Sequence, residues 1–204
     1  MKMIAIVDYD MGNLRSVEKA FLLKGFEAKV TDNPDILAAA DGMVIPGVGA
    51  FPDAMKNLRS KGLIDLICRH AASGKPLLGI CLGMQVLFEE GFEGDRCKGL
   101  GLMSGQIVRI PEGVKIPHMG WNRLKMLQES PILKGTEAGA YVYFVHSYYA
   151  ANCPPYQVAA STEYGIAIPA VVQKDNIYGL QFHPEKSSDA GLAMIKNFGE
   201  LSQC

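Results

Sequence analysis

The chain has 204 residues, 49% of them hydrophobic, and we expect residues 1–204 to form one α/β domain with a large core. Twenty basic and 21 acidic residues give a net charge of −1, so no overall field attracts nucleic acid or an anionic membrane. Five cysteines without a Cys-x-x-Cys pair, and no apolar run of signal-peptide or membrane-spanning length, predict a soluble cytoplasmic protein without a disulfide framework or structural zinc.

The first half alternates short apolar runs with amphipathic helices. The expected strands cover residues 4–7, 28–31, 43–46 and 76–80. The expected helices run from Leu14 to Lys24, from Asp53 to Ala72 and from Leu82 to Glu90. Strands that alternate with helices predict a doubly wound, mostly parallel sheet.

The pattern changes after Phe92. Short β-like segments are expected at residues 106–110, 141–145, 158–161, 170–173 and 177–182. They predict an antiparallel extension, with the second half of the chain folded over the first. A closing helix is expected from Asp189 to Leu201, with Asp189 as its N-cap.

The segment Gly79-Ile80-Cys81-Leu82-Gly83 has the pattern of a nucleophile elbow with Cys in place of Ser. Glycines on both sides let strand and helix approach closely, while Cys81 is held in a strained turn with its thiol exposed. The N–H groups at the start of the following helix favour a thiolate and an oxyanion. The four remaining cysteines lack such glycines and are assigned to packing or to the surface: Cys68, Cys97, Cys153 and Cys204.

His183-Pro184-Glu185 can supply a base and a group that orients it. His183 can accept the thiol proton, and Glu185 can hold the imidazole in the required tautomer. His-x-Glu also occurs in zinc deaminases, but these need a following Pro-Cys-x-x-Cys segment, which the chain lacks, so a metal is disfavoured. The predicted reaction class is acyl transfer through a thioester.

Gly47-Val48-Gly49 follows a predicted parallel strand, at the edge where open α/β sheets bind their ligands. The segment could be an ordinary glycine turn, but its place beside the elbow favours an oxyanion loop. Val48, Gly49 and Leu82 would then direct N–H groups at the oxyanion, and glycine would allow a peptide to flip between two states. Gly74-Lys75-Pro76 lacks the pattern of a phosphate-binding loop, and no cofactor is expected.

The segment Gly79 to Gln85 and the later His-Pro-Glu resemble the class I (triad) glutamine amidotransferases. Within that family, the segments 8–16, 118–122 and 183–187 are similar to the glutaminase subunits of imidazole glycerol phosphate synthases, in histidine biosynthesis. The resemblance implies that Cys81 attacks the side-chain amide of L-glutamine, that His183 protonates the leaving ammonia, and that Glu185 orients His183.

The resemblance also implies how glutamine is bound. Its α-amino and α-carboxylate groups would be gripped by the residues Gly47, Gly49, Gln85, Glu93, Ser147 and Tyr148. Glu93 would pair with the ammonium group. We expect His118 and His146 to be structural, since neither has a nucleophile nearby in the sequence.

Released ammonia is a nucleophile only while unprotonated, so it must be transferred to its acceptor without contact with bulk solvent. We expect the acceptor site on another polypeptide, because this chain is too short to contain it as well. The resemblance implies a TIM-barrel cyclase as the partner, in a heterodimer. Interface contacts are expected from Asn13, Trp121, Asn122, Tyr143 and Lys186. Trp121 is expected in a polar turn, and the isolated chain is expected to be nearly silent until its partner binds.

Two other interpretations of the sequence stay open. A DJ-1-like redox sensor or chaperone also places a reactive Cys on an elbow, although such proteins often carry His directly after it, where this chain has Leu82. A glutaminase component for vitamin B6 or anthranilate synthesis would keep the chemistry and change the partner. The segment Met119-Gly120-Trp121-Asn122 favours the histidine pathway.

Overall fold

The computed structural model describes residues 2–203, so the expected role of Cys204 lies outside the described residues. The helices are α1 (Leu14–Leu23), α2 (Pro34–Ala39), α3 (Phe51–Ser60), α4 (Ile64–Ala72), α5 (Leu82–Gln85) and α6 (Ser188–Leu201). No helix among these residues is long and apolar enough to cross a membrane.

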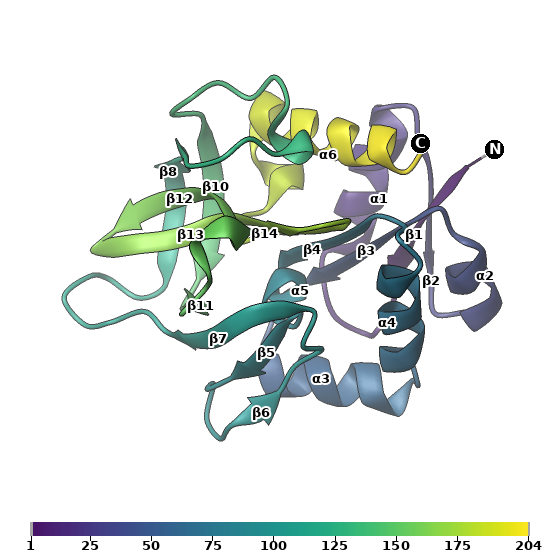
Figure 1. Ribbon diagram of the computed structural model, residues 1–204, viewed down its shortest axis with the longest axis horizontal. Helices are drawn as coiled ribbons and strands as arrows, with labels where there is room; N and C mark the ends of the chain where they lie inside the picture. Colours follow the sequence, from purple (N-terminus) through teal and green to yellow (C-terminus); the bar gives the residue numbers. More distant parts are fainter. Residues whose placement is uncertain (1, 204) are drawn as a thin grey trace.

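A mixed sheet runs through the middle of the molecule (Figure 1). Its order is β2 (Glu27–Thr31), β1 (Met3–Val7), β3 (Gly42–Gly47), β4 (Leu77–Cys81), β14 (Ile177–Leu180), β13 (Ile166–Lys174), β12 (Val158–Tyr164) and β9 (Lys125–Met126). Pairing is parallel from β2 to β14 and antiparallel from β14 to β9. The prediction of a largely parallel sheet with an antiparallel extension is confirmed.

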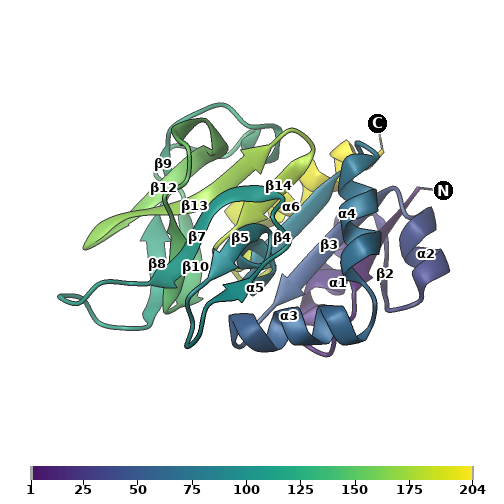
Figure 2. The same ribbon diagram turned by 60° about the horizontal axis from the view of Figure 1, so that its bottom comes forward.

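Helices cover both faces of this sheet (Figures 1 and 2). On one face α1 and α6 pack together, and the rings of Phe21 and Phe198 meet edge to face with centroids 6.0 Å apart. Helices α2, α3 and α4 contribute to the core on the opposite face. Cys81 is the last residue of β4, a strand in the middle of this sheet.

Two smaller sheets border the elbow. One contains β11 (Tyr148–Ala151), β7 (Met103–Arg109), β5 (Phe88–Gly91) and β6 (Cys97–Lys98), in that order. The other is a two-stranded ribbon of β8 (His118–Arg123) and β10 (Tyr141–His146). Apart from β5, these strands belong to the part of the chain after Phe92, which folds back towards the elbow.

The long helix expected from Asp53 to Ala72 is wrong: the chain forms α3 and α4 instead. Gly62, between them, adopts φ +67°, a left-handed conformation that suits glycine and ends a helix. The N–H of Leu63 closes the turn by donating to the Leu58 carbonyl at 2.9 Å. The break places a buried Leu63 against the core between the helices.

The helix expected from Leu82 to Glu90 also ends early, at Gln85. Phe88 is fully buried and pairs with Met103 in the β5–β7 ladder, so tertiary pairing outweighs the local helical pattern. With one turn of helix after Cys81, the helix-dipole contribution expected at the thiol is smaller than a full helix would give.

Two helix starts differ from expectation or were not anticipated. Ser187, not Asp189, precedes the first residue of α6, and its Oγ donates to the His183 carbonyl at 2.6 Å. Helix α2 was not predicted from the sequence. Asn33 caps it by accepting hydrogen bonds from the N–H groups of Asp35 and Ile36, and Pro34 occupies the first turn.

Candidate active site

Cys81 lies at the carboxyl end of β4 with φ 54° and ψ −112°, a conformation rare for a residue with a Cβ. Gly79 and Gly83, two positions to either side of Cys81, must be glycines because backbone atoms lie close to their Cα atoms. A Cβ on Gly83 would lie 1.7 Å from the carbonyl oxygen of Ile45, and one on Gly79 would lie 2.5 Å from the oxygen of Gly83. The close packing of α5 on β3 and β4 therefore holds the thiol at the crest of the sheet.

A cavity of about 330 Å³ opens beside the thiol. It is lined by Val48, Gly49, Cys81, Leu82, Gln85, Glu93, Pro117, Val145, His146, Ser147 and Tyr148. Residues from five separate stretches of sequence thus meet at one site, and they include eight of the residues predicted for catalysis, the oxyanion or glutamine. A cavity of this size suits a small polar substrate.

His183 and Glu185 form a buried pair behind the thiol. His183 Nδ1 lies 2.9 Å from Glu185 Oε1, and both side chains are about 2% exposed or less. The backbone N–H of His183 donates to the Tyr143 carbonyl at 3.0 Å. This hydrogen bond fixes the backbone from which the imidazole ring projects. Among the described residues, His183 Nε2 is buried without a hydrogen bond. An unused buried nitrogen is costly, and it is available for a reacting group.

The charge on this pair is set by its surroundings. Burial alone would lower the pKa of His183, but its interactions with the Cys81 thiol and the Glu185 carboxylate outweigh burial, and the pKa rises to about 9. The imidazolium is therefore the favoured form at neutral pH, and an imidazolium can donate a proton to a leaving group.

Gln181 is a site residue that the sequence reasoning missed. It is fully buried, its Oε1 accepts from Gln85 Nε2 at 3.0 Å, and its Nε2 lies 3.9 Å from Cys81 Sγ as a donor. The available signal was spacing, because Gln181 stands two positions before His183, and alternate residues of an extended segment share a side.

The predicted glutamine-binding residues already make protein contacts. Gln85 Nε2 donates to the carbonyl of Tyr148 at 2.9 Å, so the side chain tethers α5 to β11. Glu93 Oε2 accepts from the N–H of Phe51 at 2.8 Å, at the first turn of α3. Ser147 and Tyr148 contribute to the cavity wall between β10 and β11.

The predicted oxyanion loop lines the same cavity through Val48 and Gly49. Gly47 pairs with Cys81 in the β3–β4 register, and Gly49 adopts φ +116°. Tyr9 supports the loop from below, since its hydroxyl donates to the Pro46 carbonyl at 2.6 Å. Burial, and secondarily the charge of Cys81, raises the pKa of Tyr9, so the phenol stays protonated as a donor. Val48 at the tip is 44% exposed.

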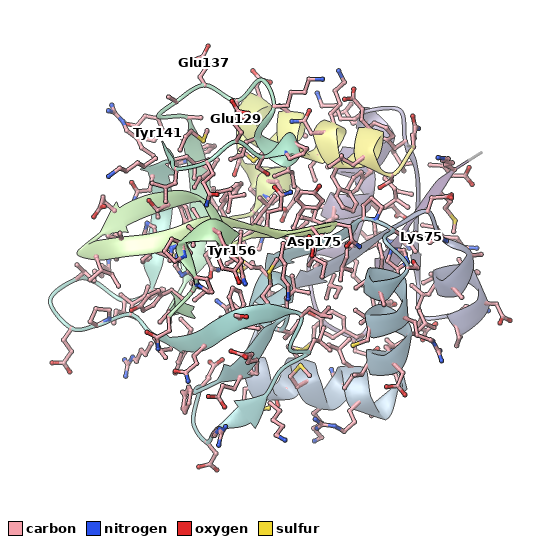
Figure 3. The ribbon with its side chains drawn as sticks, in the orientation of Figure 1. Lys75, Glu129, Glu137, Tyr141, Tyr156 and Asp175 are labelled. Atoms are coloured by element: carbon pink, nitrogen blue, oxygen red, sulfur yellow. The ribbon has the colours of Figure 1, made fainter. Side chains whose placement is uncertain are left out.

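The residues predicted for the partner interface separate into two groups. Trp121 lies in strand β8 rather than in a polar turn, is 51% exposed, and contacts Tyr143 edge to face at 6.0 Å. Lys186 is also exposed. Tyr141, labelled in Figure 3, begins β10 on the same ribbon and is 49% exposed.

The other two residues face inward. Asn13 Nδ2 donates to Glu185 Oε1 at 3.3 Å. Asn122 Nδ2 donates to the Glu163 carbonyl at 2.9 Å and lies 3.3 Å from His118 Nε2. In the described part of the chain, no group of three or more His, Cys, Asp or Glu side chains is arranged to hold a metal ion.

Comparisons with a family model and with named proteins point to the same family. Residues 5–200 match the family described as glutamine amidotransferase class-I. Two proteins named imidazole glycerol phosphate synthase subunit HisH are similar: one from Caldanaerobacter subterraneus subsp. tengcongensis, 52% identical over 99% of this chain and all of its own length, and one from Desulfitobacterium hafniense, 54% identical over 97% of this chain and 94% of its own.

Solved structures share the fold at lower identity. A glutamine amidotransferase crystal structure aligns with a TM-score of 0.78 at 22% identity, covering 98% of this chain and 99% of that one. The PurLQS structure from Thermotoga maritima aligns with a TM-score of 0.77 at 20% identity, covering 97% of each chain.

Proposed function

The chain belongs to the class I glutamine amidotransferase family, and we propose that it is the glutaminase subunit of an imidazole glycerol phosphate synthase. It hydrolyses L-glutamine to glutamate and ammonia, within a complex that acts as a lyase in histidine biosynthesis. The observation that carries this proposal is the placement of Cys81 at a strained elbow beside a cavity of about 330 Å³, with the buried His183–Glu185 pair behind it.

The proposed chemistry begins at the thiol. His183 Nε2, the buried nitrogen without a hydrogen bond in the described structure, holds the proton taken from the Cys81 thiol, because the imidazolium is the favoured form of this ring. Cys81 Sγ then bonds to the side-chain carbonyl carbon of glutamine. The carbonyl oxygen becomes an oxyanion, which N–H groups of Val48, Gly49 and Leu82 stabilise.

Collapse of the tetrahedral intermediate breaks the carbon–nitrogen bond. His183 protonates the departing nitrogen, ammonia leaves, and a glutamyl thioester remains on Cys81. Water then attacks the thioester while His183 takes its proton, and glutamate is released with the thiol restored. Glu185 holds Nδ1 throughout at 2.9 Å, which keeps Nε2 aimed at the reacting atoms.

Substrate recognition is assigned to residues of the cavity wall and of the Gly47–Gly49 loop. The Glu93 carboxylate complements the α-ammonium group, and the backbone at Ser147 and Tyr148, with Gly47, Gly49 and Gln85, holds the α-carboxylate. Gln85 acts through its tether to Tyr148, because its amide nitrogen is already shared with Tyr148 and Gln181.

Ammonia must reach an acceptor before it is protonated. The partner that we propose is a TIM-barrel cyclase, bound in a heterodimer over the exposed face of the β8–β10 ribbon. That face offers the aromatic anchors typical of interfaces, Trp121 and Tyr143, with Lys186 as a charged contact. Asn13 and Asn122 act beneath this face instead of on it.

The Gly47–Gly49 loop is the proposed gate between a silent and an active subunit. Gly49 has a backbone conformation open to glycine alone without strain, and Val48 is exposed at the tip. A peptide flip that removes one oxyanion donor costs about 100- to 1,000-fold in turnover, which is large enough to gate the reaction. Partner contacts would bias the loop towards the donor-in state.

The test measures glutamate released by the chain alone, with the cyclase, and with the cyclase plus its ligand. Activity should be lowest alone and highest in the liganded complex, and Cys81→Ala should abolish it in all three. Acceptor enzymes for vitamin B6 and anthranilate synthesis serve as alternative partners. Activation by one of these and not by the cyclase would overturn the assignment, and full activity alone would overturn the gate.

A further inference from the structure

Two histidines outside the proposed triad form a buried pair. His118 and His146 lie directly opposite each other in the β8–β10 ribbon and are 3% and 6% exposed. His118 Nδ1 lies 3.0 Å from His146 Nε2. Two imidazoles can make a hydrogen bond only if one ring donates and the other accepts, so the pair must have a fixed direction.

The direction of the hydrogen bond between the two histidines follows from the backbone carbonyl that His146 contacts with its other nitrogen. His146 Nδ1 lies 2.9 Å from the Tyr148 carbonyl, which can only accept, so this nitrogen carries a proton. In a neutral ring, Nε2 of His146 is then an acceptor, and His118 Nδ1 must donate to it. His118 Nε2 is left as an acceptor, facing the Asn122 amide nitrogen at 3.3 Å.

The surroundings keep both rings neutral and in place. Burial lowers the pKa of His118 and of His146 to about 4. The His118 ring also stacks on Tyr164 and Phe144, with centroids 3.9 and 4.7 Å apart. The ring therefore cannot flip about its Cβ–Cγ bond, which would put Cδ2 in the place of Nδ1, without breaking these stacks.

The hydrogen bonds that run from Tyr148 through His146 and His118 to Asn122 connect the substrate cavity with the surface of the β8–β10 ribbon. At one end, the Tyr148 carbonyl also accepts from Gln85 Nε2, and both Tyr148 and His146 line the cavity. At the other end, Asn122 is the neighbour of exposed Trp121 in β8. His118 itself does not line the cavity, so any influence on glutamine must pass through His146.

We propose that His118 and His146 are a positioning relay, which fixes the Tyr148 carbonyl and the adjoining glutamine-binding wall from strand β8. The kinetic part of this proposal rests on the proposed glutaminase function, whereas the direction of the relay does not. Loss of the His118 donor would free the His146 proton to move to Nε2. The bare Nδ1 would then face the Tyr148 oxygen, and two lone pairs at this distance repel.

The first test is nitrogen NMR of the full chain with ¹⁵N-labelled histidine. The sequence contains four histidines, so the ring signals can be assigned with single variants. The relay predicts that His118 and His146 both carry their proton on Nδ1, with a ¹⁵N–¹⁵N coupling across the hydrogen bond between them. A proton on Nε2 of His146, or no coupling, would overturn the proposal whatever the activity of the protein.

The second test is glutaminase kinetics of variants in complex with the cyclase. His118→Phe keeps a ring for stacking but removes both hydrogen bonds, and should raise KM for glutamine about 3- to 10-fold, with kcat changed less than about 2-fold. His118→Asn returns an N–H to the position of Nδ1 and should restore KM. An unchanged KM in His118→Phe, or no rescue by Asn, would contradict the relay.

The matched control is Tyr164→Phe. It keeps the stacked ring beside His118 and loses only the hydrogen bond from the Tyr164 hydroxyl to the Lys115 carbonyl, which is 2.7 Å long. Its KM should match that of the wild type. If the wild-type complex releases no glutamate, the proposed function fails, and the NMR result alone decides the relay.

Discussion

Asn13 and Glu185, 172 residues apart in the sequence, meet beneath the proposed partner face, where Asn13 Nδ2 donates to Glu185 Oε1 at 3.3 Å. The same oxygen contacts His183 Nδ1 at 2.9 Å. Asn13, which precedes α1, thus helps to hold the Glu185 carboxylate in place beside His183. A subunit that contacts the first turn of α1 would act directly on the carboxylate that orients His183.

This contact predicts that Asn13→Ala lowers kcat for glutamine hydrolysis about 10-fold, since one hydrogen bond to a charged group is worth about 1.5 kcal/mol at the lower end. Asn13→Asp should be worse, because it places a second carboxylate against Glu185. Steady-state assays of the complex measure the effect, with Lys19→Ala on the exposed side of α1 as the control. Wild-type kcat in Asn13→Asp would exclude the supporting role.

His183 and Glu185 should be unequal in their contributions. His183→Ala removes the proton carrier, and we expect a loss of about 100- to 10,000-fold in turnover. Glu185→Gln keeps an oxygen that accepts from Nδ1 and should cost less. Single-turnover measurements on the complex compare the two, and a larger loss in Glu185→Gln would reverse the assigned roles.

Strain at the elbow should be measurable as stability. Cys81 adopts φ 54°, so Cys81→Gly should unfold at higher urea concentration than Cys81→Ala, with a free energy of unfolding about 1 kcal/mol greater. Both variants lack the thiol and should be inactive, which separates the effect from catalysis. Equal stability of the two, or a more stable Ala variant, would show that the turn is not strained.

The raised pKa of His183 predicts a pH-dependent stability. Its pKa is about 9 in the folded chain and about 6.5 when unfolded, so the imidazolium contributes fully below about pH 6.5. This contribution declines as the pH rises and is lost above about pH 9. Urea unfolding across this range should show wild-type stability falling more steeply than that of His183→Gln. Parallel curves for the two proteins would place the folded pKa of His183 near its ordinary value.

The elbow could be predicted from the sequence because its determinants are local. Gly79 and Gly83 flank Cys81 within five residues, and His183 stands two residues from Glu185. Close backbone packing requires the two glycines. His183 and Glu185 are so near in sequence that the single 3-10 turn Pro184–Lys186 brings their side chains together. The parallel sheet was predictable for the same reason, from apolar runs that alternate with helices.

The rest depends on contacts between distant segments. Nothing near Gln181 in the sequence indicates that it reaches Gln85, 96 residues away. The helix expected after Cys81 is one turn long because Phe88 finds a partner in Met103, and that pairing exists only in the folded chain. Asn13 was predicted as a partner contact from resemblance alone, and its approach to Glu185 needed the tertiary structure.

The most direct measurement of the central claim is the trapping of the thioester. The complex with the cyclase is mixed with glutamine, quenched in acid within a turnover, and the peptide that contains Cys81 is analysed by mass spectrometry. The account predicts one glutamyl group on Cys81 in the wild type and none in Cys81→Ala. Glutamate released at full rate with no acyl group on Cys81, or with the group on another cysteine, would contradict it.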